Sequence, residues 1–134
     1  MSASPEAIVR KFCEAWKRGD IEELMSFFAA DAVYHNIPVP PVRGAKAIRE
    51  AFLGFAKLMD SIEIENLHVA ANGNVVFTER IDHFRWKGKT LALPVAGVFE
   101  VGSGPVVLNA CLIDVEVATG RATGIERISR IVDG

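Results

Sequence analysis

The spacing of apolar residues changes once along this chain, near Asp60, and that change constrains the fold class more than any other feature. Before it, apolar side chains recur every three or four residues, as in Ile8, Phe12 and Trp16, which is the period of an amphipathic helix. After it, apolar and polar residues alternate or form short apolar runs, which is typical of strands. Helices followed by a series of strands predict an α+β fold, not a parallel sheet with alternating helices.

Capping and turn residues set the expected element boundaries. Ser4-Pro5 and Asp20 are residues that favour helix starts, and Gly19 favours a helix end. Three prolines between Ile37 and Gly44 exclude both a helix and a central strand. In the helical part we therefore expect helices at about 5–18, after Asp20 and at 45–59, with a strand at 32–36 and a loop at 37–44.

The second part predicts a meander. Asn72-Gly73 is a strong hairpin signal, and further turns are expected at 87–89, 102–104 and 118–120. The expected strands lie at about 62–69, 75–86, 90–101, 105–117 and 121–131. We predict a single domain over residues 1–134, in which three helices pack on a curved, mixed and mostly antiparallel sheet. A sheet curved in this way leaves one open end, where a pocket forms.

Composition excludes several classes of function. The 134-residue chain has a net charge of −2 and no basic run, whereas phosphate binding by a nucleic-acid-binding protein needs clustered positive charge. No apolar run approaches the ~20 residues of a membrane span, so no membrane partner is expected. The two cysteines, Cys13 and Cys111, form no metal or redox motif, which favours a reducing, cytoplasmic location and no metal site.

The most informative segment for chemistry is Thr78-Glu-Arg-Ile-Asp82. Residues two apart in a strand share a face, so Arg80 and Asp82 are expected to point the same way, beside Phe84. On a concave apolar face, the arginine would hold and orient the acid. On a solvated face, the two residues would be an ordinary surface charge pair.

Two further candidates stand beside this pair. Tyr34 and Asn36 have the same spacing, and a phenol and an amide that face one pocket can hold a water molecule between them. They could instead be a strand-edge tyrosine and a turn asparagine. Asp114 interrupts an apolar run, so it either faces water or meets a partner such as Arg80.

These segments resemble the limonene-1,2-epoxide hydrolase family, within the nuclear-transport-factor-2-like and SnoaL-like superfamily. The segment from Tyr34 to Gly44, YHNIPVPPVRG, is similar to the strand and loop that follow the family's second helix. The segment Thr78-Glu-Arg-Ile-Asp82 is similar to the family's T-E-R-x-D strand, and Gly97-Val-Phe99 to its next strand. The resemblance extends from residue 5 to about residue 101.

The resemblance implies a cone-shaped α+β fold and a cofactor-free, one-step attack of water on a small apolar epoxide. By position, Tyr34 and Asn36 match the residues that hold the water. Arg80 matches the arginine between the two acids, and Asp82 matches the acid that protonates the epoxide oxygen. Such chemistry needs a proton donor for the opening ring and a base for the water. The resemblance also implies a homodimer formed through the outer face of the sheet.

The sequence departs from the family at the catalytic base. The family's W-R-D-Y-F-D motif is absent, and an ungapped match places its first aspartate at Cys111. A turn longer by three residues places it at Asp114, which we take as the base. A weaker similarity at residues 120–126 would instead place Glu126 or Arg127 near the site.

The pocket is expected to hold a small apolar epoxide and water. Its predicted lining consists of Phe28, Phe52, Phe55, Phe84 and Leu93. Two other functions fit the same fold. One is a ketosteroid-isomerase-like or dehydratase-like enzyme with Asp82 as base and Tyr34 as donor. The other is a non-catalytic protein that binds an apolar small molecule.

Overall fold

The structure is a computed structural model that describes residues 4–37, 40–102 and 106–113. Several sequence predictions lie outside these ranges: the turn at 118–120, the strand at 121–131, the end of the strand at 105–117, and the candidate bases Asp114 and Glu126.

Ser4, Gly19 and Asp20 lie at the helix ends that the sequence predicts, whereas the helix that begins at Ala45 has no side-chain cap. The helical elements are α1 (Pro5–Ala15), the 3₁₀ turn η1 (Trp16–Arg18), α2 (Ile21–Met25) and α3 (Ala45–Leu58). The Ser4 hydroxyl accepts a hydrogen bond from the Ala7 amide at the start of α1. Gly19 ends η1 in the left-handed region, with φ at +66°, a conformation that glycine adopts without steric cost.

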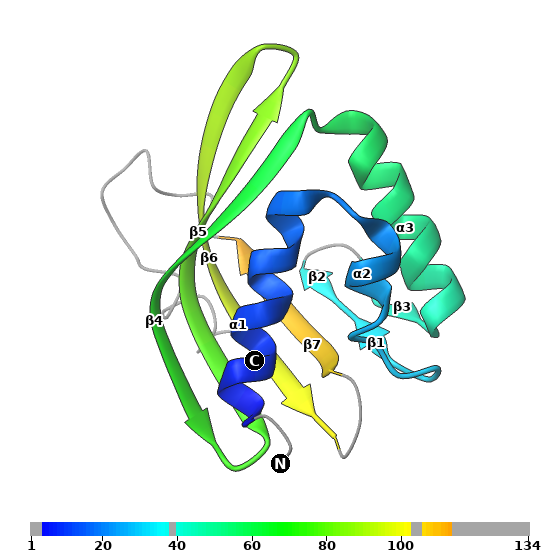
Figure 1. Ribbon diagram of the computed structural model, residues 1–134, viewed down its shortest axis with the longest axis vertical. Coiled ribbons are helices and arrows are strands. Elements are labelled where there is room, and N and C mark those ends of the chain that lie inside the picture. The colour runs from blue at the N-terminus through cyan, green and yellow to red at the C-terminus, as the bar shows by residue number, and fades with distance from the viewer. Residues whose placement is uncertain (1–3, 38–39, 103–105, 114–134) are drawn as a thin grey trace.

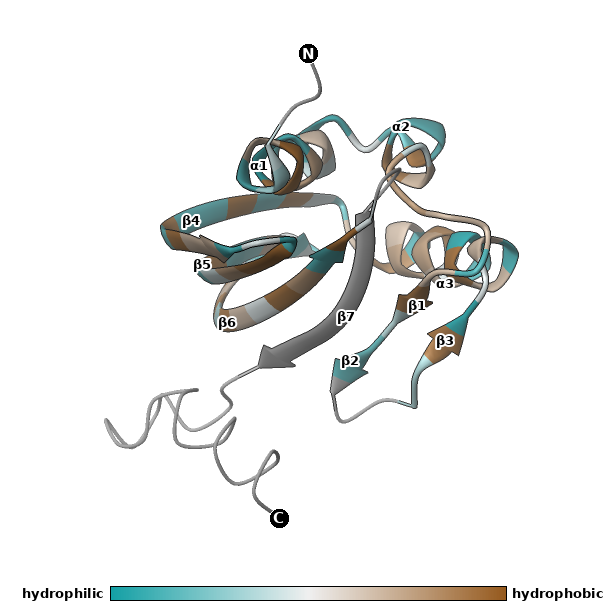
Figure 2. Ribbon diagram, turned by 90° about the horizontal axis from the view of Figure 1, so that it is seen from below, coloured by the Kyte–Doolittle hydropathy of each residue, from teal (hydrophilic) through white to brown (hydrophobic). Residues whose placement is uncertain are grey.

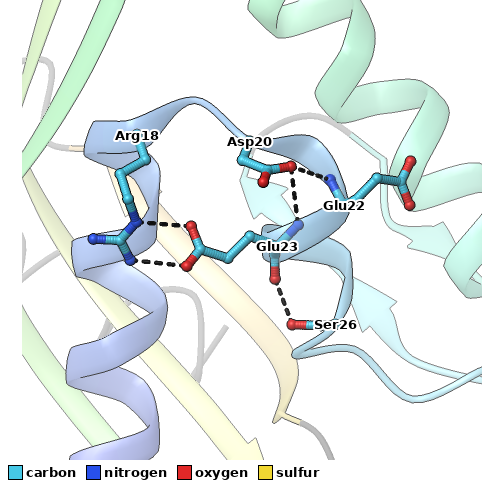
Figure 3. Close-up of polar contacts among 5 residues, drawn as sticks. All are labelled: Arg18, Asp20, Glu22, Glu23 and Ser26. Carbon is cyan, nitrogen blue, oxygen red and sulfur yellow. Dashed lines mark hydrogen bonds and ion pairs between the residues drawn. The ribbon is translucent and has the colours of Figure 1, made fainter.

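The connection between η1 and α2 is held by local polar contacts (Figure 3). The Asp20 carboxylate accepts hydrogen bonds from the amides of Glu22 and Glu23 and so caps α2. Arg18 donates two hydrogen bonds to the Glu23 carboxylate, at 2.8 and 3.0 Å. The Ser26 hydroxyl donates to the Glu23 carbonyl at the other end of this short helix. These contacts fix the direction in which the chain leaves α1.

The strands form a five-stranded mixed sheet in the order β2-β7-β6-β5-β4 and a separate two-stranded pair, β1-β3 (Figure 1). In the larger sheet, β2 and β7 are parallel and the other neighbours are antiparallel, which confirms the predicted mixed, mostly antiparallel sheet. The strands are β1 (Val33–Tyr34), β2 (Asn36–Ile37), β3 (Val42–Arg43), β4 (Ser61–Asn72), β5 (Val75–Trp86), β6 (Lys89–Val101) and β7 (Val106–Ile113).

The segment between α2 and α3 differs from the prediction. The expected strand at 32–36 is interrupted at His35, so Tyr34 belongs to β1 and Asn36 to β2. The expected loop at 37–44 contains β3, in which Val42 pairs with Tyr34. The reason is a change of partner: the chain leaves the small sheet at His35 and joins β7 of the large sheet one residue later. The prolines limit β3 to two residues but do not prevent it.

The core lies between α1 and the concave face of the sheet. Helix α1 lies over β4 and β5, whereas α3 packs mainly against α2, β1 and β3 (Figures 1 and 2). Phe12 on α1 is at the centre of an aromatic cluster and packs edge-on against Trp16, Phe27, Phe28 and Phe99. No helix in the described ranges is long and apolar enough to cross a membrane.

Candidate active site

One row of side chains on β5 faces the core and carries the polar residues of the candidate site. Val76, Thr78, Arg80, Asp82 and Phe84 are all buried, while their neighbours in the sequence are more exposed. This alternation is the period of a strand with one covered face. Arg80 and Asp82 therefore form a buried pair, and the alternative of a solvated surface pair is excluded.

The Arg80 guanidinium holds the Asp82 carboxylate through two hydrogen bonds. Arg80 Nε donates to Asp82 Oδ1 at 2.9 Å, and Arg80 Nη2 donates to Oδ2 at 3.3 Å. The guanidinium carbon lies 6.0 Å from the centre of the Phe99 ring, which adds a cation–π contact. A two-point contact of this kind fixes the plane of the carboxylate as well as its position.

Tyr34 and Asn36 reach the same cavity from different sheets. Tyr34 comes from β1 and packs edge-on against Phe52 of α3, with ring centres 5.1 Å apart. Asn36 comes from β2, at the edge of the large sheet. The structure places Tyr34, Asn36, Arg80 and Asp82 together in the lining of one cavity.

This cavity has a volume of about 360 Å³ and is mainly apolar. Four of the five predicted lining residues, Phe52, Phe55, Phe84 and Leu93, do line it. Phe28 does not belong to the lining: it is 5% exposed and packs in the core against Phe12 and Phe52. Phe28 follows the end of the short α2, and its ring contacts with Phe12 of α1 and Phe52 of α3 hold it in the core.

Sequence reasoning missed part of the lining. The additional residues are Phe12, Trp16, Pro40, Val42, Ala51, Ile62 and Ile64. Phe12 and Trp16 are four residues apart on one face of the N-terminal segment, and Ile62 and Ile64 alternate along β4. These spacings indicated apolar faces, but a periodic pattern does not distinguish a packed core from the wall of a cavity.

The sheet register shows where position 111, the ungapped equivalent of the family's catalytic base, lies relative to the site. Thr78 pairs with Gly97, Gly97 pairs with Cys111, and Cys111 pairs with Asn36. These four positions form one row across the sheet. Position 111, the ungapped equivalent of the family's base, thus lies in the same row as Asn36. Asp114 lies outside the described residues, so its role as base stays a prediction.

Gly97 leaves the space that Arg80 and Thr78 occupy. A β-carbon at this position would lie 2.7 Å from Thr78 Oγ1, 2.9 Å from Arg80 Nη1 and 3.1 Å from a carbon of the Phe99 ring. A β-carbon essentially never lies closer than 3.0 Å to another heavy atom, so a neighbour would have to shift. Glycine is therefore favoured here because the side chains of Thr78 and Arg80 approach the backbone, not because of a special φ angle.

Cys13 lies beneath the site on α1 and is 2% exposed. Burial raises the pKa of the Cys13 thiol, and the positive charge of Arg80 acts in the opposite direction with a smaller effect. The thiol is therefore neutral near pH 7, whereas a nucleophilic cysteine needs a lowered pKa. Cys13 serves as a small core residue.

Comparison with known families decides the classification. The model of the SnoaL-like domain matches residues 9–109, which include both β5 and the segment that carries Tyr34 and Asn36. The chain belongs to the SnoaL-like domain family. The cone fold of SnoaL-like proteins hosts isomerases, cyclases and epoxide hydrolases, so the family determines the fold but not the reaction.

Solved structures show the same SnoaL-like fold. An LEH-like epoxide hydrolase of M. tuberculosis is 25% identical, with a TM-score of 0.76 over 84% of this chain and 79% of that one. A candidate SnoaL-like polyketide cyclase from Shewanella putrefaciens is 15% identical, with a TM-score of 0.77 over 90% and 96%. A Catenulispora acidiphila protein with a ketosteroid isomerase-like fold is 19% identical, with a TM-score of 0.70 over 84% and 86%.

Proposed function

We propose that this protein is a cofactor-free epoxide hydrolase that adds water to a small apolar epoxide in one step. The observation that carries the proposal is the convergence of Tyr34, Asn36, Arg80 and Asp82 on one aromatic-lined cavity. The likeness to an LEH-like epoxide hydrolase supports it. A cavity of about 360 Å³ is at the lower end of the range for small-molecule sites and suits a compact apolar molecule.

Each polar residue has one role in the proposed reaction. Tyr34 and Asn36 hold the attacking water, because a phenol and an amide can both donate and accept hydrogen bonds. Asp82 protonates the epoxide oxygen as the ring opens, and Arg80 holds Asp82 in place. Asp114 takes the proton from the water. The apolar lining excludes bulk water and strengthens these polar contacts.

The charges of the buried groups explain why the reaction needs a second carboxylate. Arg80 and ionised Asp82 cancel each other, so the pair alone has no proton to deliver. A second carboxylate that shares Arg80 gives the buried group a net negative charge, and binding of one proton neutralises it. That proton is the one that Asp82 donates to the epoxide.

The isomerase-like or dehydratase-like alternative is favoured by a different observation. Among the described residues that line the cavity, Asp82 is the one carboxylate. A single carboxylate is sufficient to move a proton between two atoms of a substrate, with Tyr34 as hydrogen-bond donor. If Cys111 is the equivalent of the family's base, the water has no carboxylate to activate it. The isomerase-like or dehydratase-like alternative, or non-catalytic binding of an apolar ligand, then gains support.

The test is hydrolysis of limonene-1,2-epoxide in the absence of added cofactor by three proteins: the parent chain, Asp114→Asn and Cys111→Ser. We expect the parent to form the diol. We expect Asp114→Asn to lose about 10²–10⁴ of the rate, the usual contribution of a general base, and Cys111→Ser to retain the parent rate. Loss only in Cys111→Ser would remove Asp114 as base. A parent that forms no diol from any small apolar epoxide would contradict the proposed function.

A further inference from the structure

The apolar lining of the cavity continues onto the molecular surface along the β5–β6 hairpin. Trp86 is two residues beyond the cavity residue Phe84 on β5, and Leu91 pairs with Phe84 across the hairpin. Both lie on the same side of the sheet as Phe84, yet they are 45% and 50% exposed. The hairpin extends beyond the rest of the fold next to the end of α3 (Figure 1).

The end of α3 contributes to the same surface. Leu58 is three residues after the cavity residue Phe55 and is 61% exposed. The amide of Asp60 donates to the carbonyl of Arg85 at 2.7 Å, which joins the end of α3 to the hairpin. We call the surface formed by residues 57–60 and 85–91 the hairpin edge.

Basic residues lie next to the apolar residues in the sequence of the hairpin edge. Residues 57–60 and 85–91 contain Lys57, Arg85, Lys87 and Lys89 but one acid, Asp60, although the whole chain has a net charge of −2. The Lys87 ammonium lies over the Trp86 ring, 5.2 Å from its centre. The hairpin edge therefore combines exposed apolar side chains with a local excess of positive charge.

We propose that the hairpin edge binds the surface of a lipid bilayer that contains anionic lipids. Tryptophan and leucine enter the interfacial region of a bilayer, where an indole ring is favoured. Lysine and arginine next to them stay at the level of the headgroups and attract anionic lipids. A second copy of the chain fits this surface less well, because a symmetric contact would bring the same positive charges together.

This contact differs from the sequence-based expectation of no membrane partner. That expectation rested on the lack of a membrane-spanning segment, and a surface contact needs none. The homodimer that the resemblance implies would form through the outer face of the sheet, whereas Trp86 and Leu91 lie on the face of Phe84. Under the proposed function, the membrane contact would give the substrate a route into the cavity. An apolar epoxide dissolved in the bilayer would pass along Leu91 and Phe84 without crossing water. Only this route of the substrate depends on the proposed function; the binding of the hairpin edge to a bilayer does not.

The experiment measures co-sedimentation of the full chain with lipid vesicles, without substrate, so that its outcome does not depend on any enzymatic activity. One set of vesicles is pure phosphatidylcholine and the other contains about 30 mol% phosphatidylglycerol. We expect binding to the anionic vesicles, weak binding to the neutral ones, and loss of binding in about 1 M salt, where charges are screened.

Matched variants assign the binding to the hairpin edge. Removing each positive charge near an anionic bilayer should lower the partition coefficient about fivefold, so Lys87→Gln/Lys89→Gln should lower it about 25-fold. Lys46→Gln, at the opposite end of α3, is the control for charge. Leu91→Ser should also weaken binding, whereas Leu67→Ser is the control for an equally exposed leucine, at 46%.

The fluorescence of Trp86 reports contact with the bilayer in the parent protein, without any variant that could lower its stability. Anionic vesicles should shift the fluorescence emission of the parent to shorter wavelength, and Trp86→Phe should keep the binding but lose the shift. Absence of binding by the parent would overturn the proposal. The proposal would also be overturned if the double variant Lys87→Gln/Lys89→Gln and the variant Leu91→Ser both bound vesicles as well as the parent does. A change of oligomeric state in these variants, without a change in vesicle binding, would overturn it too.

Discussion

Asp82→Asn is expected to reduce the rate of epoxide hydrolysis by about 10²–10⁴, because the amide cannot deliver a proton to the epoxide oxygen. The substitution keeps the shape of the side chain and removes its charge. It also leaves the buried guanidinium of Arg80 without the carboxylate that it now holds at 2.9 Å. The amide still offers an oxygen to Arg80, and in the proposed site a second carboxylate shares the guanidinium, so the loss of folding free energy should stay below the about 3–5 kcal/mol that removal of one partner of a buried ion pair costs. The rate must therefore be measured at a temperature at which circular dichroism shows a folded variant.

Glu79→Gln is the matched control for Asp82→Asn. Glu79 is also an acid on β5, but it is exposed and pairs with His68. The same change from acid to amide should leave the rate near that of the parent. If folded Asp82→Asn hydrolyses epoxides as fast as the parent does, Asp82 is not the proton donor.

Gly97→Ala is expected to impair the site without altering any polar group. The added carbon would collide with Thr78 Oγ1 and Arg80 Nη1, and overpacking of this kind costs about 1–3 kcal/mol. A displacement of Arg80 by about 1 Å would carry Asp82 with it and lower the rate of hydrolysis by about 100-fold. Steady-state kinetics and thermal unfolding measure the two effects separately.

Gly54→Ala is the corresponding control for Gly97→Ala. A β-carbon at Gly54 in α3 would meet no atom within 4 Å. Alanine is favoured over glycine inside a helix by about 1 kcal/mol, so this variant should be at least as stable as the parent and equally active. Parent-level activity and stability in Gly97→Ala would show that the Arg80 guanidinium is not confined by this glycine.

Much of the fold was predictable because local chemistry decides it. Ser4, Asp20 and Gly19 act within one helical turn, and their effects were visible in the sequence. The Arg80 and Asp82 spacing was equally informative, since a regular strand places both on one face. In contrast, the division of residues 32–36 between two sheets depends on distant partners, Val42 and Cys111. No local signal specifies such partners.

Long-range packing also explains which features of the candidate site could not be predicted from the sequence. Phe28 and Phe52 both belong to the buried core, yet only Phe52 also lines the cavity. The difference arises from the way α2 and α3 pack, which periodicity does not encode. The role of Gly97 was also hidden, because it depends on the length of the Arg80 side chain in the neighbouring strand.

The most direct test of the account is the source of the oxygen in the product. The parent protein, in excess over limonene-1,2-epoxide, is allowed a single turnover in water labelled with oxygen-18. One-step attack by a water held at Tyr34 and Asn36 predicts a diol that carries one labelled oxygen from the first turnover. An unlabelled new hydroxyl would mean that a carboxylate of the protein attacked first and formed a covalent intermediate. That result, or the absence of diol, would contradict the account.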